Sequence, residues 1–244
     1  MRLLILGGTA EARQLAGLVA KTRGVEPVLS LAGRTSQPFE QGVPVRVCGF
    51  GGGDGVRNYL ITSEIDAVID ATHPFATQIT HNATLAVSGL DVSLLHIDRP
   101  AWEPRPPELW ISVPDIASAV EALPRGARVF TATGRGSLDH FLARDDIYTC
   151  LRVMEDQSDT YPGNGEFVVA RPPFSVDAEV AVLKHHAATH LLVKNAGGAA
   201  GRTKLTAAGK LFLPIIVVDR QPLPDGAMSV SSADAALSWL QGLI

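Results

Sequence analysis

The stretch Leu3-Leu4-Ile5-Leu6-Gly7-Gly8-Thr9-Ala10-Glu11-Ala12, close to the start of the chain, decides the fold. Its apolar run over 3–6 predicts a parallel strand that is buried on both faces. Gly7 and Gly8 suit a tight turn that lets backbone approach a ligand, because neither residue carries a Cβ. Thr9 suits the N-cap of a helix in which apolar residues recur at helical spacing. A strand, a glycine turn and a helix N-terminus together predict an anion-binding site, to which we assign Gly7, Gly8, Thr9 and Glu11.

The end of the second strand, expected over 27–31, indicates which dinucleotide this site would take. The fingerprint GxGxxG is matched only in part, and a plain strand-to-helix turn is the alternative. No Asp or Glu stands where an NAD site would bind the ribose 2′-hydroxyl. Arg34 and Thr35 stand there instead, and a guanidinium beside hydroxyl groups suits a 2′-phosphate. The residues therefore predict NADPH as the cofactor, with a solvated surface arginine as the alternative.

The composition limits the class of protein. The chain has 244 residues, of which 46% are hydrophobic and 19% charged, as in soluble proteins of one large or two small domains. A net charge of −4 argues against a nucleic-acid partner, and no apolar run reaches the length of a membrane span. Cys48 and Cys150 lack the spacing of a metal site, so we expect no metal and two thiols in a reducing cytoplasm.

Strands and helices alternate along almost the whole chain. This alternation predicts an α/β fold of two Rossmann-like halves, each with a parallel sheet, and a cleft between them. The expected domains are 1–112, which would bind the cofactor, and 113–244, which would contribute the substrate site. Four prolines between 98 and 107 mark the linker. Beyond the two strands already named, we expect strands over 43–47, 67–70, 92–97, 127–132, 147–153, 166–171, 191–194 and 213–218, and a closing helix over 233–243.

Polar residues follow two strands of the first half, at the sheet edge where such folds bind ligands. The glycine-rich loop 49–55 precedes a helix expected from residue 56. We expect Gly51 beside the adenosine end of the cofactor, with a flexible turn as the alternative. After the fourth strand, Pro74 fixes the direction of His73, a candidate proton donor, and we expect Thr72 and Pro74 to touch the cofactor. A histidine that only caps or bonds locally is the alternative.

Cations gather at the strand ends of the second half. An acidic protein that concentrates cations at one sheet edge predicts a ligand with several carboxylates or phosphates, and scattered solvated charges are the alternative. The linker adds the aromatic ring of Trp102 and the guanidinium groups of Arg99 and Arg105, which suit a groove for an acidic ligand, and a spacer with one packed tryptophan is the alternative. The expected substrate contacts are Arg99, Trp102, Gly134, Arg135, Arg171, Lys194, Gly197, Gly198 and Lys204, with Arg202 in the same glycine-rich loop over 195–204.

Several of these stretches, taken in order over nearly the whole chain, resemble the precorrin-6A reductases of cobalamin biosynthesis. The stretches are Gly7-Gly8-Thr9-Ala10-Glu11-Ala12, Asp70-Ala71-Thr72-His73-Pro74-Phe75-Ala76, Arg99-Pro100-Ala101-Trp102, Thr133-Gly134-Arg135 and Lys194-Asn195-Ala196-Gly197-Gly198 with Lys204. The segments 30–35 and 49–52 are similar to the aerobic-pathway branch. Asn195-Ala196 departs from the small pair expected in the family.

The resemblance implies an oxidoreductase that uses NADPH to reduce one double bond of the precorrin-6A macrocycle, giving precorrin-6B. It also implies a polycarboxylate tetrapyrrole as the substrate of the second half, and neighbouring enzymes of the pathway as partners. A non-catalytic NADP(H)-binding regulator and a methyltransferase of the same pathway are the competing hypotheses.

Overall fold

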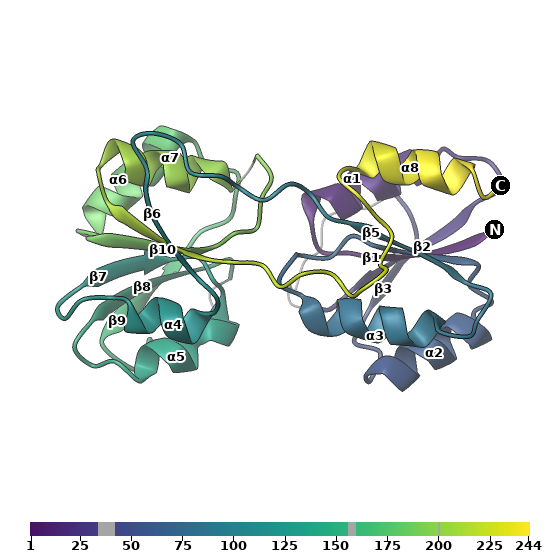
Figure 1. Cartoon of the computed structure of the whole chain (residues 1–244), viewed down its shortest axis with the longest axis horizontal. Coiled ribbons are helices and arrows are strands. Elements are labelled where there is room, and N and C mark those ends of the chain that lie inside the picture. The colour runs from purple at the N-terminus through teal and green to yellow at the C-terminus, as the bar shows by residue number, and fades with distance from the viewer. Residues whose placement is uncertain (34–41, 156–159, 200) are drawn as a thin grey trace. The chain divides into compact units, whose positions relative to one another are not determined.

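The computed structural model describes residues 1–33, 42–155, 160–199 and 201–244, so Arg34 and Thr35 lie outside the described residues. The chain divides into two compact units (Figure 1). Unit 1 comprises Met1–Pro100 together with Gln221–Ile244, and unit 2 comprises Ala101–Arg220. These units differ from the contiguous domains 1–112 and 113–244 expected from the sequence, because the last segment of the chain returns to unit 1.

Unit 1 is built on a six-stranded parallel sheet with the order β12-β5-β4-β1-β2-β3. Helices α1 and α8 cover one face of this sheet, and α2 and α3 cover the other (Figure 1). Strands β1 and β4 are apolar along almost their whole length because both of their faces are covered. The elements are β1 (Arg2–Leu6), α1 (Ala10–Val19), β2 (Glu26–Leu31), β3 (Val45–Val47), α2 (Gly53–Thr62), β4 (Ala67–Asp70), α3 (Thr77–Val87), β5 (Ser93–Ile97), β12 (Ser229–Val230) and α8 (Ala233–Gln241).

Unit 2 repeats this plan, with a parallel sheet in the order β6-β11-β10-β7-β8-β9. Helices α6 and α7 cover one face, and α4 and α5 cover the other (Figure 1). Among the described residues of both units, no helix is long and apolar enough to cross a membrane. The elements are β6 (Leu109–Val113), α4 (Ile116–Glu121), β7 (Arg128–Thr131), the 3₁₀ turn η1 (Arg135–Ser137), α5 (Leu138–Leu142), β8 (Tyr148–Val153), β9 (Gly165–Val169), α6 (Val176–His185), β10 (His190–Lys194), α7 (Arg202–Lys210) and β11 (Pro214–Val218).

The sixth strand of each sheet is displaced in the sequence. Both sheets have the 3-2-1-4-5-6 order of dinucleotide-binding folds. In unit 1 the sixth strand is β12, which follows the whole of unit 2, and in unit 2 it is β6, which precedes the other five strands. The predicted α/β fold with two parallel sheets is confirmed, and every strand expected from the sequence is present. The strands that were not expected are β6 and β12.

Two helices differ from the sequence predictions. Helix α2 begins at Gly53, three residues earlier than expected, after Gly51 and Gly52 have turned the chain with φ angles of +82° and +95°. Gly55 is required inside this helix, since a Cβ there would lie 1.7 Å from the Phe50 carbonyl oxygen. The glycine-rich loop of unit 2 ends earlier than expected, because α7 begins at Arg202.

Candidate functional site

The glycine turn after β1 lies at the carboxyl edge of the unit 1 sheet, beside the end of β4. Helices α1 and α3, which follow these two strands, cover opposite faces, and such a point is where parallel sheets bind ligands (Figure 1). A Cβ on Gly7 would lie 2.5 Å from Cδ1 of Leu29, so a larger residue there would require the buried Leu29 side chain to move. Gly8 has a φ of +114°, and a Cβ on it would meet nothing within 4 Å, which leaves its backbone open to a ligand.

Thr9 joins this turn to the loop after β4. Its Oγ1 accepts a hydrogen bond of 3.1 Å from the Ala12 amide and donates one of 2.6 Å to the Ala71 carbonyl. The N-cap predicted at Thr9 is therefore confirmed. The amides of the first turn of α1 have no acceptors within the helix and carry the positive end of its dipole, so this turn can hold a phosphate group.

Asp70, the last residue of β4, organises the loop that follows it. The carboxylate is buried and accepts hydrogen bonds from the Thr72 amide and hydroxyl, from the Thr80 hydroxyl at 2.6 Å, and from Nδ1 of His96 at 3.2 Å. Burial opposes ionisation, but the hydrogen bonds from His96, Thr80 and Thr72 outweigh it and hold the pKa of this carboxyl below its usual value. An ionised Asp70 therefore fixes Thr72 and the start of α3 against the sheet.

His73 lies on the same loop, with an exposed ring. Its Nδ1 accepts a hydrogen bond of 3.2 Å from the Phe75 amide, and the two rings lie 5.8 Å apart between centroids. An Nδ1 that accepts this bond leaves the proton of the neutral ring on Nε2. Pro74, between the two aromatic residues, is half-buried. The sequence left open a histidine that only forms a local hydrogen bond, and such a bond, from the Phe75 amide, is present. The same bond orients the His73 ring.

Glu11 and Arg99 meet at the N-terminus of α1. Nη1 of Arg99 donates to Oε2 of Glu11, and the side chains are 13% and 22% exposed respectively. The sequence placed Glu11 at the cofactor and Arg99 at the substrate, but both lie in unit 1, beside the glycine turn after β1.

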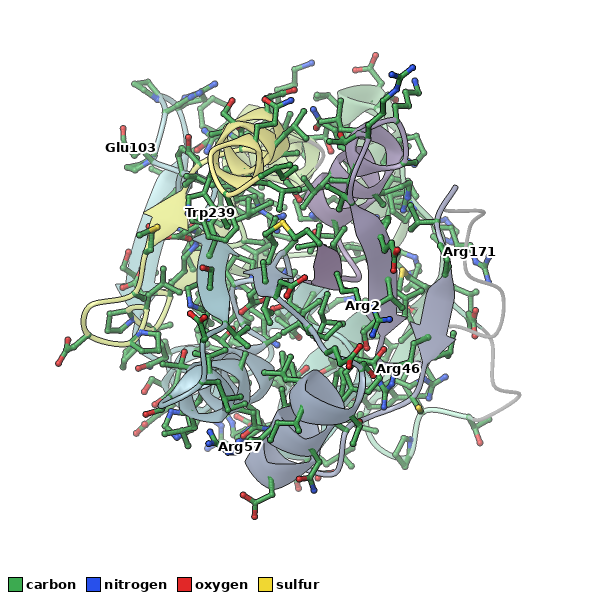
Figure 2. The ribbon with its side chains drawn as sticks, turned by 90° about the vertical axis from the view of Figure 1, so that its right-hand side faces the viewer. Arg2, Arg46, Arg57, Glu103, Arg171 and Trp239 are labelled. Atoms are coloured by element: carbon green, nitrogen blue, oxygen red, sulfur yellow. The ribbon has the colours of Figure 1, made fainter. Side chains whose placement is uncertain are left out.

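Arg46, on the edge strand β3, is a cation that the sequence reasoning missed (Figure 2). Its guanidinium donates to Oγ of Ser30 at 3.2 Å and to the carbonyls of Cys48 and Gly49 at 2.7 and 2.9 Å. It also lies 3.9 Å above the centre of the Phe50 ring. These contacts tie the glycine-rich loop to the end of β2, where the ribose of a dinucleotide is usually held.

In unit 2, the turn after β7 is held by a chain of buried hydroxyl groups. Oγ1 of Thr133 lies 3.0 Å from Oγ1 of Thr131 and 2.6 Å from Oγ of Ser137, which donates to the Gly134 carbonyl. Gly134 has a φ of +83° and starts the turn η1. Lys194, the last residue of the adjacent strand β10, donates from Nζ to the Thr133 carbonyl at 3.2 Å. This arrangement fixes an ammonium group at the carboxyl edge of the second sheet.

Lys204 lies in the first turn of α7, next to a buried ion pair. Arg152 and Glu179 form two hydrogen bonds of 2.9 and 2.8 Å with side chains that are only 6% and 1% exposed. Nζ of Lys204 donates to the Gly201 carbonyl at 3.2 Å, and no carboxylate of the described residues forms an ion pair with it. Burial lowers the pKa of Lys204, as does the charge of Arg152, while Glu179 opposes them. The pair neutralises itself, so Lys204 is a surplus positive charge at this edge.

The remaining predicted cations of unit 2 differ in their partners. Arg202 binds Glu108 with two hydrogen bonds of 2.6 and 2.7 Å, and Arg171 binds Glu155 at 2.8 Å. Both thus have a carboxylate partner within the chain. The Arg135 guanidinium lies 4.1 Å over the centre of the Phe167 ring.

Trp102 is buried and anchors the start of unit 2 to the loop after β10. Its backbone N–H donates to Oδ1 of Asn195 at 2.8 Å, its carbonyl accepts from Nδ2 of Asn195, and its indole N–H donates to the Gly198 carbonyl at 2.7 Å. A Cβ on Gly201 would lie 2.5 Å from the indole ring, so this position requires glycine. Gly197 and Gly198 take φ angles of +68° and +77° that let the loop turn around the ring. The structure therefore places Trp102 inside the unit, as the packed tryptophan of the alternative reading.

Each unit thus gathers its own part of the predicted site. Unit 1 brings Gly7, Gly8, Thr9, Glu11, Thr72 and His73 to one sheet edge, and unit 2 brings Gly134, Arg135, Lys194 and Lys204 to another. The sequence reasoning missed Arg46, the Asp70–His96 pair and Asn195. The aspartate at the end of a buried strand was a usable signal for the second of these, because a buried carboxylate requires hydrogen-bond donors. Asn195, the departure from the family pattern, holds Trp102.

Comparison with known proteins gives consistent results. A family model described as precorrin-6x reductase CbiJ/CobK matches residues 2–241. The precorrin-6A reductase of Rhodococcus erythropolis is 40% identical over 98% of this chain and 97% of its own length. That of Rhodobacter capsulatus is 41% identical over 98% and 95%. A solved structure described as CobK precorrin-6A reductase is 40% identical and superposes with a TM-score of 0.93, covering 99% of this chain and 96% of its own.

Proposed function

The chain belongs to the precorrin-6x reductase family, CbiJ/CobK, and we propose that NADPH supplies the hydride with which it reduces a double bond of precorrin-6A in cobalamin biosynthesis. The observation that carries the assignment is the match at about 40% identity over almost the full length of the relatives. Cys48 is exposed and Cys150 is buried, and both are free cysteines. Free thiols fit a reaction in the reducing cytoplasm.

The carboxyl edge of unit 1 fits a dinucleotide. The open backbone at Gly8 and the first turn of α1 supply amide donors for the phosphates. Glu11, neutralised by Arg99, leaves the positive end of the helix available to an anion. None of residues 32–39, which directly follow β2 in the sequence, is acidic, and this supports NADPH over NADH.

The carboxyl edge of unit 2 fits the carboxylates of the tetrapyrrole. Lys204 is the surplus charge beside a self-neutralised pair, and Lys194 and Arg135 lie at the ends of adjacent elements. Because a carboxylate side chain of the macrocycle would pair with an ammonium group that has lost part of its hydration, each contact gains strength from the low local dielectric.

Reduction of a carbon–carbon double bond adds a hydride to one carbon and a proton to the other. We assign the proton to His73, whose exposed ring is held by the Phe75 amide at the carboxyl end of β4. His73→Asn keeps an acceptor for the Phe75 amide and removes the titratable ring. We expect kcat to fall about 100-fold, within the range for a lost general acid, with little change in the KM for either substrate. An unchanged kcat would show that the proton comes from elsewhere.

The reductase assignment is tested by anaerobic incubation of the purified protein with precorrin-6A and NADPH. We expect NADPH absorbance to fall in step with a shift of the macrocycle spectrum, one cofactor for each macrocycle. Binding of NADPH without any spectral change would instead favour the non-catalytic regulator.

Arg34 tests the choice of cofactor. We expect Arg34→Ala to raise the KM for NADPH by about 10- to 100-fold, the value of a lost charged hydrogen bond, and to leave the KM for NADH nearly unchanged. Arg125→Ala, which removes a side chain that is 91% exposed in unit 2, serves as the control. Equal losses with both cofactors would contradict a 2′-phosphate contact.

A further inference from the structure

A cluster of three metal-ligating side chains lies in unit 2, apart from the residues assigned above. Cys150 comes from β8, Glu166 from the edge strand β9, and His186 from the C-terminal end of α6. Cys150 and Glu166 are register partners on adjacent strands. One ligand atom from each residue lies within 4.8 Å of the other two. From this convergence we propose that the cluster is a zinc site.

The distances come close to those of a tetrahedral zinc centre. Sγ of Cys150 lies 3.5 Å from Oε1 of Glu166, and Nδ1 of His186 lies 2.9 Å from the same oxygen. Zinc bonds of ordinary length place a thiolate sulfur about 3.5 Å, and an imidazole nitrogen about 3.3 Å, from a shared carboxylate oxygen. The two distances to the shared carboxylate oxygen are therefore within about 0.5 Å of those in a zinc site, and the sulfur and the imidazole nitrogen lie within 4.8 Å of each other.

The donor set and its burial also suit zinc. Sulfur, nitrogen and oxygen donors together are typical of Zn²⁺, whereas Mg²⁺ and Ca²⁺ take oxygen alone. The Cys150 side chain is fully buried and that of His186 is 11% exposed, but the Glu166 side chain is 39% exposed. Water can therefore reach the cluster from the Glu166 side and occupy the fourth position. When zinc binds, the Cys150 thiol proton leaves to solvent and the sulfur–zinc bond replaces the sulfur–hydrogen bond.

Neighbouring groups hold the ligands in place. Nε of Arg128 donates to the His186 carbonyl at 3.0 Å, and the His186 ring lies 6.0 Å from that of Phe130 between centroids. His186 follows the last residue of α6, which places it at the end of that helix remote from the Arg152–Glu179 pair in the first turn. The ion would thus join two strands and a helix.

The test is the zinc content of the purified protein after removal of metal and re-equilibration with Zn²⁺ alone. We expect one zinc per chain by elemental analysis. With Co²⁺ in its place, we expect the near-ultraviolet absorption of a thiolate–cobalt bond. Cys150→Ser should weaken zinc binding at least tenfold and abolish that absorption, and Glu166→Gln, which changes an exposed carboxylate, should weaken zinc binding without disturbing the fold.

The chain offers matched controls for the cysteine and histidine ligands. Cys48 is the other free cysteine and is exposed in unit 1, and His185 precedes His186 with its ring 4.8 Å away. Cys48→Ser and His185→Ala should keep the zinc content and the cobalt spectrum, whereas His186→Ala should lose both. No zinc above background, or equal binding by Cys150→Ser, Glu166→Gln and wild type, would overturn the site and leave a hydrogen-bonded cluster.

Discussion

Replacement of Lys204 by methionine is expected to raise the KM for precorrin-6A by about 10- to 100-fold, the value of one charge-assisted hydrogen bond. Methionine keeps the approximate length of the side chain but removes the ammonium group, whose nitrogen lies 5.9 Å from the centre of the Trp102 ring. The KM for NADPH should stay within about twofold, since unit 1 is unchanged. The measurement is steady-state kinetics with each substrate varied in turn.

For the same variant we expect that stability does not fall, although the affinity for precorrin-6A does. Because burial lowers the pKa of Lys204 and no carboxylate of the described residues pairs with it, its charge costs the folded state free energy. Lys204→Met should therefore leave the free energy of unfolding unchanged or higher. Lys210→Met, at the exposed end of the same helix, is the control and should change neither KM. A joint loss of stability and of affinity for both substrates would mean that Lys204 serves the fold instead.

Replacement of Glu179 by leucine is expected to lower the free energy of unfolding by about 3–5 kcal/mol, the cost of leaving one partner of a buried ion pair alone. Arg152 would keep its charge between the rings of Phe130 and Phe174, with the Lys204 ammonium near by. The loss should appear as a fall of about 6–20 °C in the thermal midpoint.

Two comparisons sharpen this expectation. Glu64→Leu removes a carboxylate that is 76% exposed and paired with Arg2, and should cost less than about 1 kcal/mol. The double variant Arg152→Met with Glu179→Leu removes both charges and should recover most of the lost stability. A single Glu179→Leu variant as stable as Glu64→Leu would contradict the importance of the buried pair.

The sequence predicted most of the sheet because central parallel strands carry a strong local signal. The apolar runs of β1, β4, β7, β10 and β11 are buried on both faces and read as strands on their own. The strands that were missed lie at sheet edges. β12 has only two residues, and β6 exposes Leu109 and Ile111 at 52% and 44%. No local pattern indicates which sheet an edge strand joins, since the choice depends on contacts far away in the sequence.

Site residues were predictable where the residue type itself indicates a local role in the backbone. Gly8 and Thr9 were read from their backbone and capping chemistry, and the structure places them as that chemistry requires. The hydrogen-bond and ion-pair partners of these polar side chains could not be predicted from the sequence. Glu108, more than ninety positions before Arg202, binds it, and Asn195 reaches back to Trp102. The sequence shows that a side chain is positively charged. Only the fold shows whether that side chain already forms an ion pair with a carboxylate of the same chain.

The return of the last segment to unit 1 has a consequence for the order in which the protein is completed on the ribosome. Every strand of unit 2 has been synthesised before β12 and α8 emerge, so unit 2 can close its sheet while unit 1 still lacks a strand and a helix. The core around α1 is then sealed by Ala233, Ala236 and Leu240 of α8. A nascent chain that stops short of these residues would lose the half that begins at its N-terminus, with the cofactor site, while the half made later stands complete.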